Sequence, residues 1–231
     1  MVVLGDSTDD TERQLLSIGS PKIKIIKTVW EFKKYNHGGE LLSRQTNIGK
    51  QACSGDWIFY LQGDELIHED DLEWMAHELE FYLDKKQVEG FSFKYLHFWG
   101  DADHYAFMEN TGMDMIRVVR NDKHIESSSD AHLFVRNKPL LAWPIGVMTV
   151  PLKVIPAGCR IYHYSYVKAE KAQENRFLLY FQLYKGNKAI EKSENNLKKE
   201  GFTYGDLQKL PVFKGKHPKL IEPYLKSLSA K

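Results

Sequence analysis

The chain has little cysteine, no long hydrophobic run and no excess of charge of either sign. Its two cysteines, Cys53 and Cys159, are too few for a disulfide scaffold and fit the reducing cytoplasm. No apolar stretch approaches the roughly 20 residues of a membrane span, and there is no signal-peptide pattern, so we expect no membrane-spanning segment. A net charge of +1, from 32 basic and 31 acidic residues, argues against a nucleic-acid binder, which needs a basic excess.

The first third of the chain alternates strand-like and helix-like segments. Hydrophobic residues make up 42% of the chain, which is enough for a sizeable core. The periodicity predicts strands at residues 2–4, 22–27 and 57–61, and helices at 11–18, 38–53 and 69–85. The run at 57–61 does not alternate, so we expect it to be buried on both faces. Such alternation predicts a parallel sheet covered by helices.

The rest of the chain follows a different pattern. Strands are predicted at residues 91–99, 115–119 and 147–155, separated by long connections at 100–114 and 121–146 without periodicity of their own. An aromatic-rich helix is predicted at 170–184, followed by a lysine-rich tail with a second helix and irregular chain.

An acidic segment directly follows the strand at residues 57–61. Asp64 stands beyond the carboxyl end of that strand, where ligands bind in open α/β sheets. A carboxylate there can hold Mg²⁺ or Mn²⁺, which in turn binds a diphosphate, and Gly63 allows a sharp turn. The alternative is that Asp64 or Glu65 caps the next helix, the role that we assign to the acids at 69–71.

Three further residues are candidates, each with an ordinary structural alternative. His163, which lies among tyrosines in the sequence, could be a metal ligand or a histidine packed in the core. Asp6 follows the first strand among small residues and could contact a nucleotide, or belong to a plain turn. Asp130 could act as a general base, although most loop aspartates do not. The chain lacks the G-x-G-x-x-G and phosphate-loop signatures and shows no Ser-His-Asp pattern.

Taken together, these segments resemble the inverting family 2 glycosyltransferases of the GT-A fold. The resemblance lies in "VVLGDSTDDT" and "LLSRQTNIGKQACSGDWIFYLQGDELIHEDDL". That family shows a strand ending in D-G-S-x-D-x-T, an R-x-x-N-x-G segment closed by G-D, and a strand ending in D-x-D. "IRVVRN", "SSSDAHLF" and "IYHYSYV" are similar to one bacterial and archaeal branch of it.

The resemblance implies a fold and a division of the chain. The expected fold is an α/β, GT-A-like domain with a mostly parallel sheet flanked by helices over residues 1–167, followed by a helical and irregular extension over 168–231. Family members carry an additional first strand with an N-E-E-like loop. This chain begins at the second strand of that pattern, which leaves open whether the start lies upstream, the sequence is a fragment, or the element is lost.

The implied activity is transfer of a sugar, with inversion, from a nucleotide-diphosphate sugar to a hydroxyl-bearing acceptor such as a glycan or a lipid-linked compound. Asp64 matches the last Asp of D-x-D, the ligand of Mn²⁺ or Mg²⁺ and through it of the diphosphate. His163 matches a late histidine that completes the metal shell in many GT-A enzymes. Asp130 lies near the place of the catalytic base.

Four residues are matched to the donor nucleotide. Asp6 falls near the aspartate that contacts the base, and Arg44 matches an arginine that contacts the nucleotide. Asn47 shares a helix face with Arg44. Gln62 stands where the family has the first Asp of D-x-D, and its amide can hydrogen-bond a ribose hydroxyl.

Two other functions are compatible with the sequence. One is a non-catalytic nucleotide-sugar-binding or scaffolding domain, which the missing first strand and Gln62 favour. The other is a nucleotidyltransferase, which is also metal-dependent and α/β, but which usually shows a glycine-rich loop bearing Lys or Arg after its first strand. Diphosphate binding without turnover, or pyrophosphate release from a nucleoside triphosphate, would distinguish them.

Overall fold

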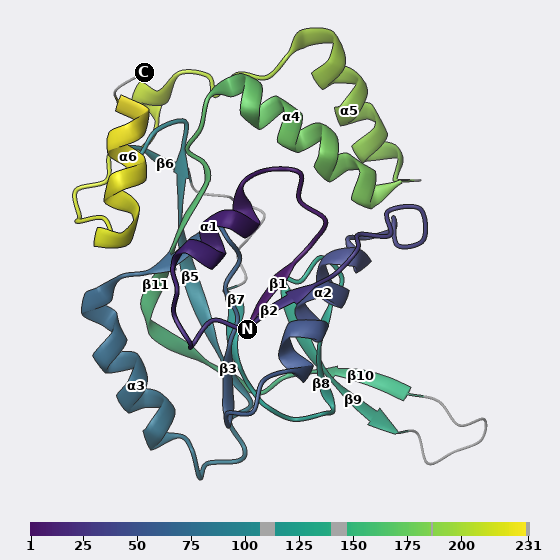
Figure 1. Cartoon of the computed structure of the whole chain (residues 1–231), viewed down its shortest axis with the longest axis vertical. Helices are drawn as coiled ribbons and strands as arrows, with labels where there is room; N and C mark the ends of the chain where they lie inside the picture. Colours follow the sequence, from purple (N-terminus) through teal and green to yellow (C-terminus); the bar gives the residue numbers. More distant parts are fainter. Residues whose placement is uncertain (107–113, 140–146, 186, 230–231) are drawn as a thin grey trace. The chain divides into compact units, whose positions relative to one another are not determined.

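The computed structural model describes residues 1–106, 114–139, 147–185 and 187–229 of the 231-residue chain (Figure 1). The strands are β1 (Val2–Leu4), β2 (Ile25–Lys27), β3 (Trp57–Phe59), β4 (Glu65–Ile67), β5 (Gly90–Trp99), β6 (Tyr105–Ala106), β7 (Met115–Arg120), β8 (Ile125–Ser128), β9 (Leu133–Pro139), β10 (Val147–Pro151) and β11 (Val154–Tyr166). The α-helices are α1 (Thr11–Ser17), α2 (Glu40–Gln51), α3 (Leu72–Phe81), α4 (Glu170–Phe181), α5 (Lys188–Glu200) and α6 (Glu222–Ser229). Short 3₁₀ turns lie at Glu69–Asp71, Gln182–Tyr184, Leu207–Lys209 and Lys219–Ile221.

The strands form three sheets. β1 and β2 make a two-stranded sheet, and β10, β9 and β8 make a three-stranded one in that order. The largest sheet has the order β3-β7-β5-β11-β4, with β6 paired to β5. β11 runs parallel to β5 on one side and antiparallel to β4 on the other, so this sheet is mixed.

The predicted fold class, a mostly parallel GT-A-like sheet flanked by helices, is wrong. Parallel pairing joins β1 to β2 and β5 to β11, but β4–β11, β5–β6, β8–β9 and β9–β10 are antiparallel. The alternation of strands and helices breaks after β3, because β4 follows without an intervening helix and pairs antiparallel with β11. A strand order that alternates with helices therefore does not by itself fix the direction of pairing.

Most predicted elements exist, with several differences. The connection predicted at 121–146 contains β8 and β9, a hairpin joined at residues 129–132, and the strand predicted at 147–155 is divided between β10 and β11. The stretches 107–113 and 140–146 of the two predicted connections lie outside the described residues. The strand predicted as doubly buried ends at Phe59, and only Ile58 in it is buried.

The core of the largest sheet lies along β5 and β11. Phe91, Phe93 and Phe98 on β5 and Ile161 on β11 are each 0% exposed. A central strand covered on both faces accounts for the non-alternating sequence of β5. Phe98 stacks on Tyr164 with ring centroids 4.8 Å apart, which joins the two strands through their side chains as well as their backbones.

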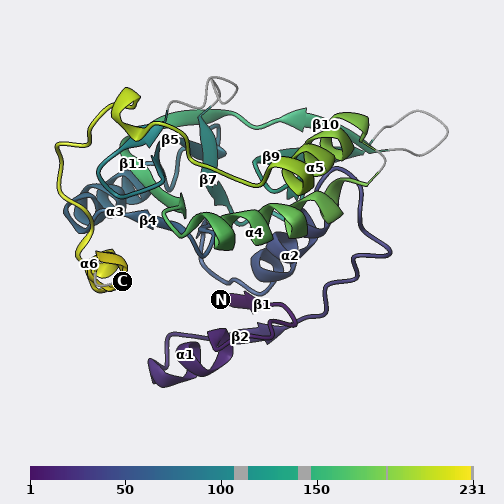
Figure 2. The ribbon, with the colours of Figure 1, turned by 90° about the horizontal axis from the view of Figure 1, so that it is seen from above.

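Contacts divide the chain into two compact units. The first unit comprises Met1–Ile58, Val119–Leu152 and Gln182–Asn187, and the second comprises Phe59–Val118, Lys153–Phe181 and Lys188–Lys231. In the first unit α2 packs on β8, and in the second unit α4 and α5 lie side by side (Figure 2). A boundary at residue 167 stays a prediction.

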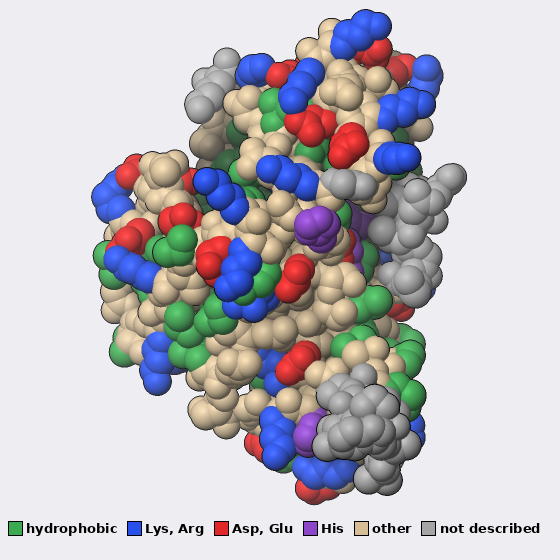
Figure 3. Space-filling view, turned by 90° about the vertical axis from the view of Figure 1, so that its right-hand side faces the viewer, with side chains coloured by type: hydrophobic (Ala, Val, Ile, Leu, Met, Phe, Trp, Pro, Cys, Tyr) green, Lys and Arg blue, Asp and Glu red, His purple; other side chains and the backbone are tan. Residues whose placement is uncertain are grey.

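The surface charges and the helices can be compared with the expectations of balanced charge and no membrane-spanning segment. Lys and Arg side chains are interspersed with Asp and Glu on the face drawn in Figure 3, in keeping with the balanced charge. Among the described residues, no helix combines the length and the apolar composition that crossing a bilayer requires.

Candidate functional site

The pairing of β4 with β11 brings Asp64 and His163 together in the second unit. Asp64 is the residue before β4, and its carbonyl accepts a 2.9 Å hydrogen bond from the backbone of Tyr164 on β11. His163 pairs in register with Glu65. As a result, His163 Nε2 lies 3.7 Å from Asp64 Oδ2. The antiparallel ladder thus places two distant residues side by side, while their role as metal ligands stays a prediction.

The surroundings of His163 keep its imidazole neutral. Its side chain is 10% exposed and lies among Tyr95, Tyr166 and His97, with the two Nδ1 atoms of the histidines 2.9 Å apart. Burial lowers the pKa of His163 below its ordinary value, outweighing the nearby carboxylates of Asp64 and Glu65, which raise it. A neutral imidazole is the form that binds a metal ion.

Asp64 stays ionised in this setting. Burial raises the pKa of its carboxyl group, but His163, the Ser165 hydroxyl and Arg176 together outweigh burial and lower that pKa. Arg176 Nη2 lies 3.5 Å from Asp64 Oδ2, at the limit of a hydrogen bond. The Asp64 side chain is still 26% exposed, so a ligand can reach it.

Arg176 and Ser165 are members of this cluster that sequence reasoning missed. Ser165 is 0% exposed, and within the described residues its hydroxyl makes no hydrogen bond of ordinary geometry. His163 and Ser165 alternate along β11, and that period of two could have placed both on one face. Arg176 comes from α4, and no local pattern marks it. Gln173, one turn earlier on α4, is also 0% exposed, and its amide has no partner among the described residues.

These donors fit a divalent cation. A carboxylate oxygen, a neutral imidazole nitrogen and a hydroxyl oxygen suit Mn²⁺ well and Mg²⁺ acceptably. The buried Ser165 hydroxyl lowers the pKa of Asp64 but makes no hydrogen bond of ordinary geometry with the residues that the structure describes, which favours a ligand here because buried polar groups are normally hydrogen-bonded. Arg176 contacts Asp64 Oδ2, the oxygen that lies 3.7 Å from His163 Nε2, so it would have to turn away from this oxygen if a cation bound between Asp64 and His163.

Glu65, the neighbour of Asp64, is fully occupied. Its two carboxylate oxygens accept hydrogen bonds from Arg117 at 2.8 and 2.9 Å, from Tyr95 at 2.8 Å and from the backbone of Gln62 at 3.1 Å. Its side chain is 1% exposed and that of Arg117 is 2% exposed. The Gln62 amide, predicted to contact a ribose, donates to the Tyr60 hydroxyl at 3.1 Å. Glu65 is therefore a structural group.

The other residues matched to the nucleotide belong to the first unit. Asp6 accepts a 3.1 Å hydrogen bond from the backbone of Trp30. The Asn47 amide bridges α2 to β8, because it both donates to and accepts from the backbone of Ser127, at 3.0 and 2.8 Å. This arrangement commits Asn47 to the fold, whereas nucleotide contacts of Asp6 and Asn47 stay predictions.

Arg44 lines a cavity of the first unit. Its guanidinium lies 3.9 Å from the centre of the Tyr35 ring, a cation–π contact. The cavity, of about 280 Å³, is lined by Thr28, Val29, Glu31, Tyr35, Leu41, Arg44, Gln45 and Ile48. An aromatic ring, an arginine and amide and carboxylate groups around one cavity suit a planar polar ligand.

Asp130 is held by two side chains of the first unit. Its carboxylate accepts a hydrogen bond from the Tyr184 hydroxyl at 3.1 Å and contacts His132 Nδ1 at 2.7 Å. Ser129 and Ala131 on either side have φ of 55° and 63°, strained values for residues other than glycine. Burial raises the pKa of Asp130, but His132 and Tyr184 outweigh burial and lower it. Asp130 therefore stays ionised, and its role as a base stays a prediction.

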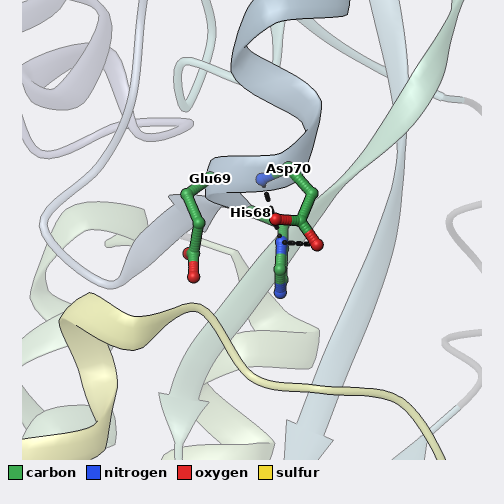
Figure 4. Close-up of side chains that lie close together, drawn as sticks. All are labelled: His68, Glu69 and Asp70. Carbon is green, nitrogen blue, oxygen red and sulfur yellow. Dashed lines mark hydrogen bonds and ion pairs between the residues drawn. The ribbon is translucent and has the colours of Figure 1, made fainter.

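A second group of possible metal ligands lies at the start of α3. Ligand atoms of His68, Glu69 and Asp70 lie within 4.8 Å of one another. In Figure 4 both dashed lines join His68 to Asp70: Nδ1 accepts from the Asp70 backbone at 3.2 Å and lies 3.5 Å from its carboxylate. Glu69 accepts a 3.1 Å bond from the backbone of Lys219. These hydrogen bonds use the Nδ1 lone pair of His68 and the carboxylate of Glu69. We therefore interpret the group as a cap of the helix N-terminus, the role that the sequence predicts for the acids at 69–71.

Comparison with known proteins supplies no assignment: no protein-family model matches the chain, and no curated protein matches it either.

Proposed function

We propose that the protein binds a divalent cation and a nucleotide-diphosphate sugar, and transfers the sugar to a hydroxyl-bearing acceptor. The observation that carries the proposal is the proximity of Asp64 and His163, beside the buried Ser165 hydroxyl and Arg176. The resemblance of the segment from Arg44 to Glu65 to family 2 glycosyltransferases supplies the reaction class. The proposal does not depend on a GT-A fold.

Each residue of the cluster has a separate task. Asp64 supplies a charged oxygen, and His163 supplies a neutral nitrogen. A cation held there would stabilise the negative charge of the departing diphosphate. Arg176 donates charged N–H groups to Asp64 and would turn from it to a phosphate oxygen, for which guanidinium geometry is well suited.

Acceptor activation is assigned to Asp130, as the resemblance implies. The carboxylate is ionised, as a general base must be, but its oxygens are taken up by His132 and Tyr184. One of these contacts would have to break for Asp130 to accept a proton directly. A single displacement at the anomeric carbon, with the acceptor oxygen attacking and the diphosphate leaving, inverts the configuration.

Calorimetry tests the site. We expect UDP or GDP to bind wild-type protein with Mn²⁺ more tightly than without it. Asp64→Asn should weaken the Mn²⁺-dependent affinity at least about tenfold, because a charged ligand is lost while the side-chain shape is kept. The melting temperature should stay close to that of wild type, because only long contacts of about 3.5–3.7 Å are removed.

Asp70→Asn is the matched control, since it removes an equivalent charge from the other group of possible ligands. It should leave the affinity unchanged. Equal affinity of Asp64→Asn and wild type, or a loss confined to Asp70→Asn, would contradict the proposed site. Release of nucleoside diphosphate from UDP-sugars or GDP-sugars separates an enzyme from a binding domain, and release of pyrophosphate from a nucleoside triphosphate would indicate a nucleotidyltransferase instead.

A further inference from the structure

A pair of histidines lies behind the candidate metal ligand. His97 on β5 and His163 on β11 are both buried, and their Nδ1 atoms are 2.9 Å apart. The ring planes are nearly perpendicular, at 83°, with centroids 4.8 Å apart. Because both Nδ1 atoms lie within hydrogen-bond distance, a single hydrogen between them must belong to one ring and be accepted by the other.

This shared hydrogen determines what His163 presents to Asp64. When His163 carries the hydrogen on Nδ1, its Nε2 has a lone pair directed to the side of Asp64, as a metal ligand requires. When His97 carries it, neutral His163 must carry its own hydrogen on Nε2 and cannot bind a cation there. The choice between the two tautomers therefore controls whether His163 can act as a ligand.

The backbone places His97 within hydrogen-bond distance of His163. β5 and β11 run parallel, and His163 is the register partner of His97. The ring of His97 also stacks on Tyr95 with centroids 5.1 Å apart, and the Tyr95 hydroxyl is fixed by Glu65. The acceptor atom is thus placed by the sheet and by a packed aromatic ring, in a region where little water competes for the hydrogen bond.

We propose that His97 is a positioning residue that accepts the Nδ1–H of His163 and so holds its Nε2 lone pair toward the Asp64 side of the site. The proposal deepens the proposed function and rests on it for the identity of the ligand. It assigns to His97 no contact with the cation or the substrate. The Nε2 lone pair of His163 is then available to a cation before any cation binds.

The test combines nitrogen NMR with two substitutions. In metal-free wild-type protein, ¹⁵N shifts of the imidazoles should show His163 as the Nδ1–H tautomer, and His163 should keep this tautomer when Mg²⁺ is added. His97→Phe keeps an aromatic ring but removes the acceptor, so His163 should move to the Nε2–H tautomer and Mn²⁺ affinity should fall about 10–100-fold. His97→Asn retains an acceptor and should rescue both readings.

His217→Asn is the matched control. His217 Nδ1 lies 2.9 Å from the hydroxyl of Tyr164, the residue after His163 on β11, whose side chain lies on the opposite face of the strand. This variant should leave the tautomer of His163 and the Mn²⁺ affinity unchanged. An equal effect of His217→Asn and His97→Phe would overturn the proposal, since it would show only a loss of packing.

The remaining outcomes also decide the matter. An Nε2–H tautomer of His163 in wild-type protein, both with and without Mg²⁺, would overturn the proposal, as would His97→Phe with wild-type tautomer and affinity. If wild type binds no cation, the proposed function fails, but the tautomers of wild type and His97→Phe still decide the role of His97. If His97→Phe does not fold, the wild-type spectrum decides it, since an Nε2–H tautomer of His163 there overturns the proposal and an Nδ1–H tautomer supports it.

Discussion

Asp64 and Glu65 are adjacent in the chain, of one chemical type, and differ in almost every contact. Glu65 is 1% exposed and is bound by Arg117, Tyr95 and the backbone of Gln62, all within 3.1 Å. Asp64 is 26% exposed, and its contacts with His163 and Arg176 are 3.7 and 3.5 Å long. One carboxylate has its hydrogen bonds made within the protein, whereas the other has groups gathered around it at longer range.

The difference separates a structural acid from a candidate binding acid. A buried carboxylate needs several hydrogen bonds to offset the loss of water, and Glu65 has them. Asp64 lies near the guanidinium of Arg176, the imidazole of His163 and the hydroxyl of Ser165. These groups are too distant to satisfy the hydrogen-bonding capacity of the carboxylate, which leaves it available to a ligand. Glu65 is the first residue of β4 and Asp64 directly precedes it, so one step along the chain is enough to change the environment.

Breaking the Glu65–Arg117 pair should have the largest effect. Glu65→Met or Arg117→Met leaves one buried charge without its partner, and we expect a loss of roughly 3–5 kcal/mol in the free energy of unfolding. Urea denaturation of each variant measures it. The double variant, with both charges removed, should recover much of the loss, because no charge is then left buried. Single variants within about 1 kcal/mol of wild type would show that the pair is not structural.

Removing the Asn47 amide should have a smaller effect of the same kind. Asn47→Ala leaves both backbone groups of Ser127 without their partner, which we expect to cost about 1–3 kcal/mol. Asn47 resembles Glu65 in that its hydrogen bonds are made within the protein. Denaturation together with nucleotide calorimetry tests it, with Gln51→Ala, an exposed change on the same helix, as the control. Unchanged stability with weakened nucleotide binding would instead indicate that Asn47 contacts the nucleotide of the sugar donor.

Local elements could be predicted from the sequence, but the pairing of strands could not. The helix at α2 and the strand at β5 follow from periodicity and apolar runs that adjacent residues determine. The antiparallel pairing of β4 with β11 depends on residues far apart in the chain, and a three-residue strand at Glu65–Ile67 gives no signal of its direction.

The candidate site was predictable only where a motif marks it. Asp64 and His163 were expected through resemblance to a family, and their proximity follows from the register of β11. Arg176 follows the polar first half of α4, so nothing local distinguishes it from a surface arginine. The internal hydrogen bonds of Asn47 and Glu65 could not be predicted from the sequence, because their partners come from other elements.

The most direct test of the contrast between Asp64 and Glu65 is anomalous diffraction from crystals grown with Mn²⁺ and UDP. Manganese scatters strongly at its absorption edge, so its position can be read without assuming a ligand set. We predict one anomalous peak within bonding distance of both the Asp64 carboxylate and His163 Nε2, with the Glu65–Arg117 pair unchanged. A peak at His68, Glu69 and Asp70 instead, or none beside Asp64 with Mn²⁺ in excess, would contradict the account.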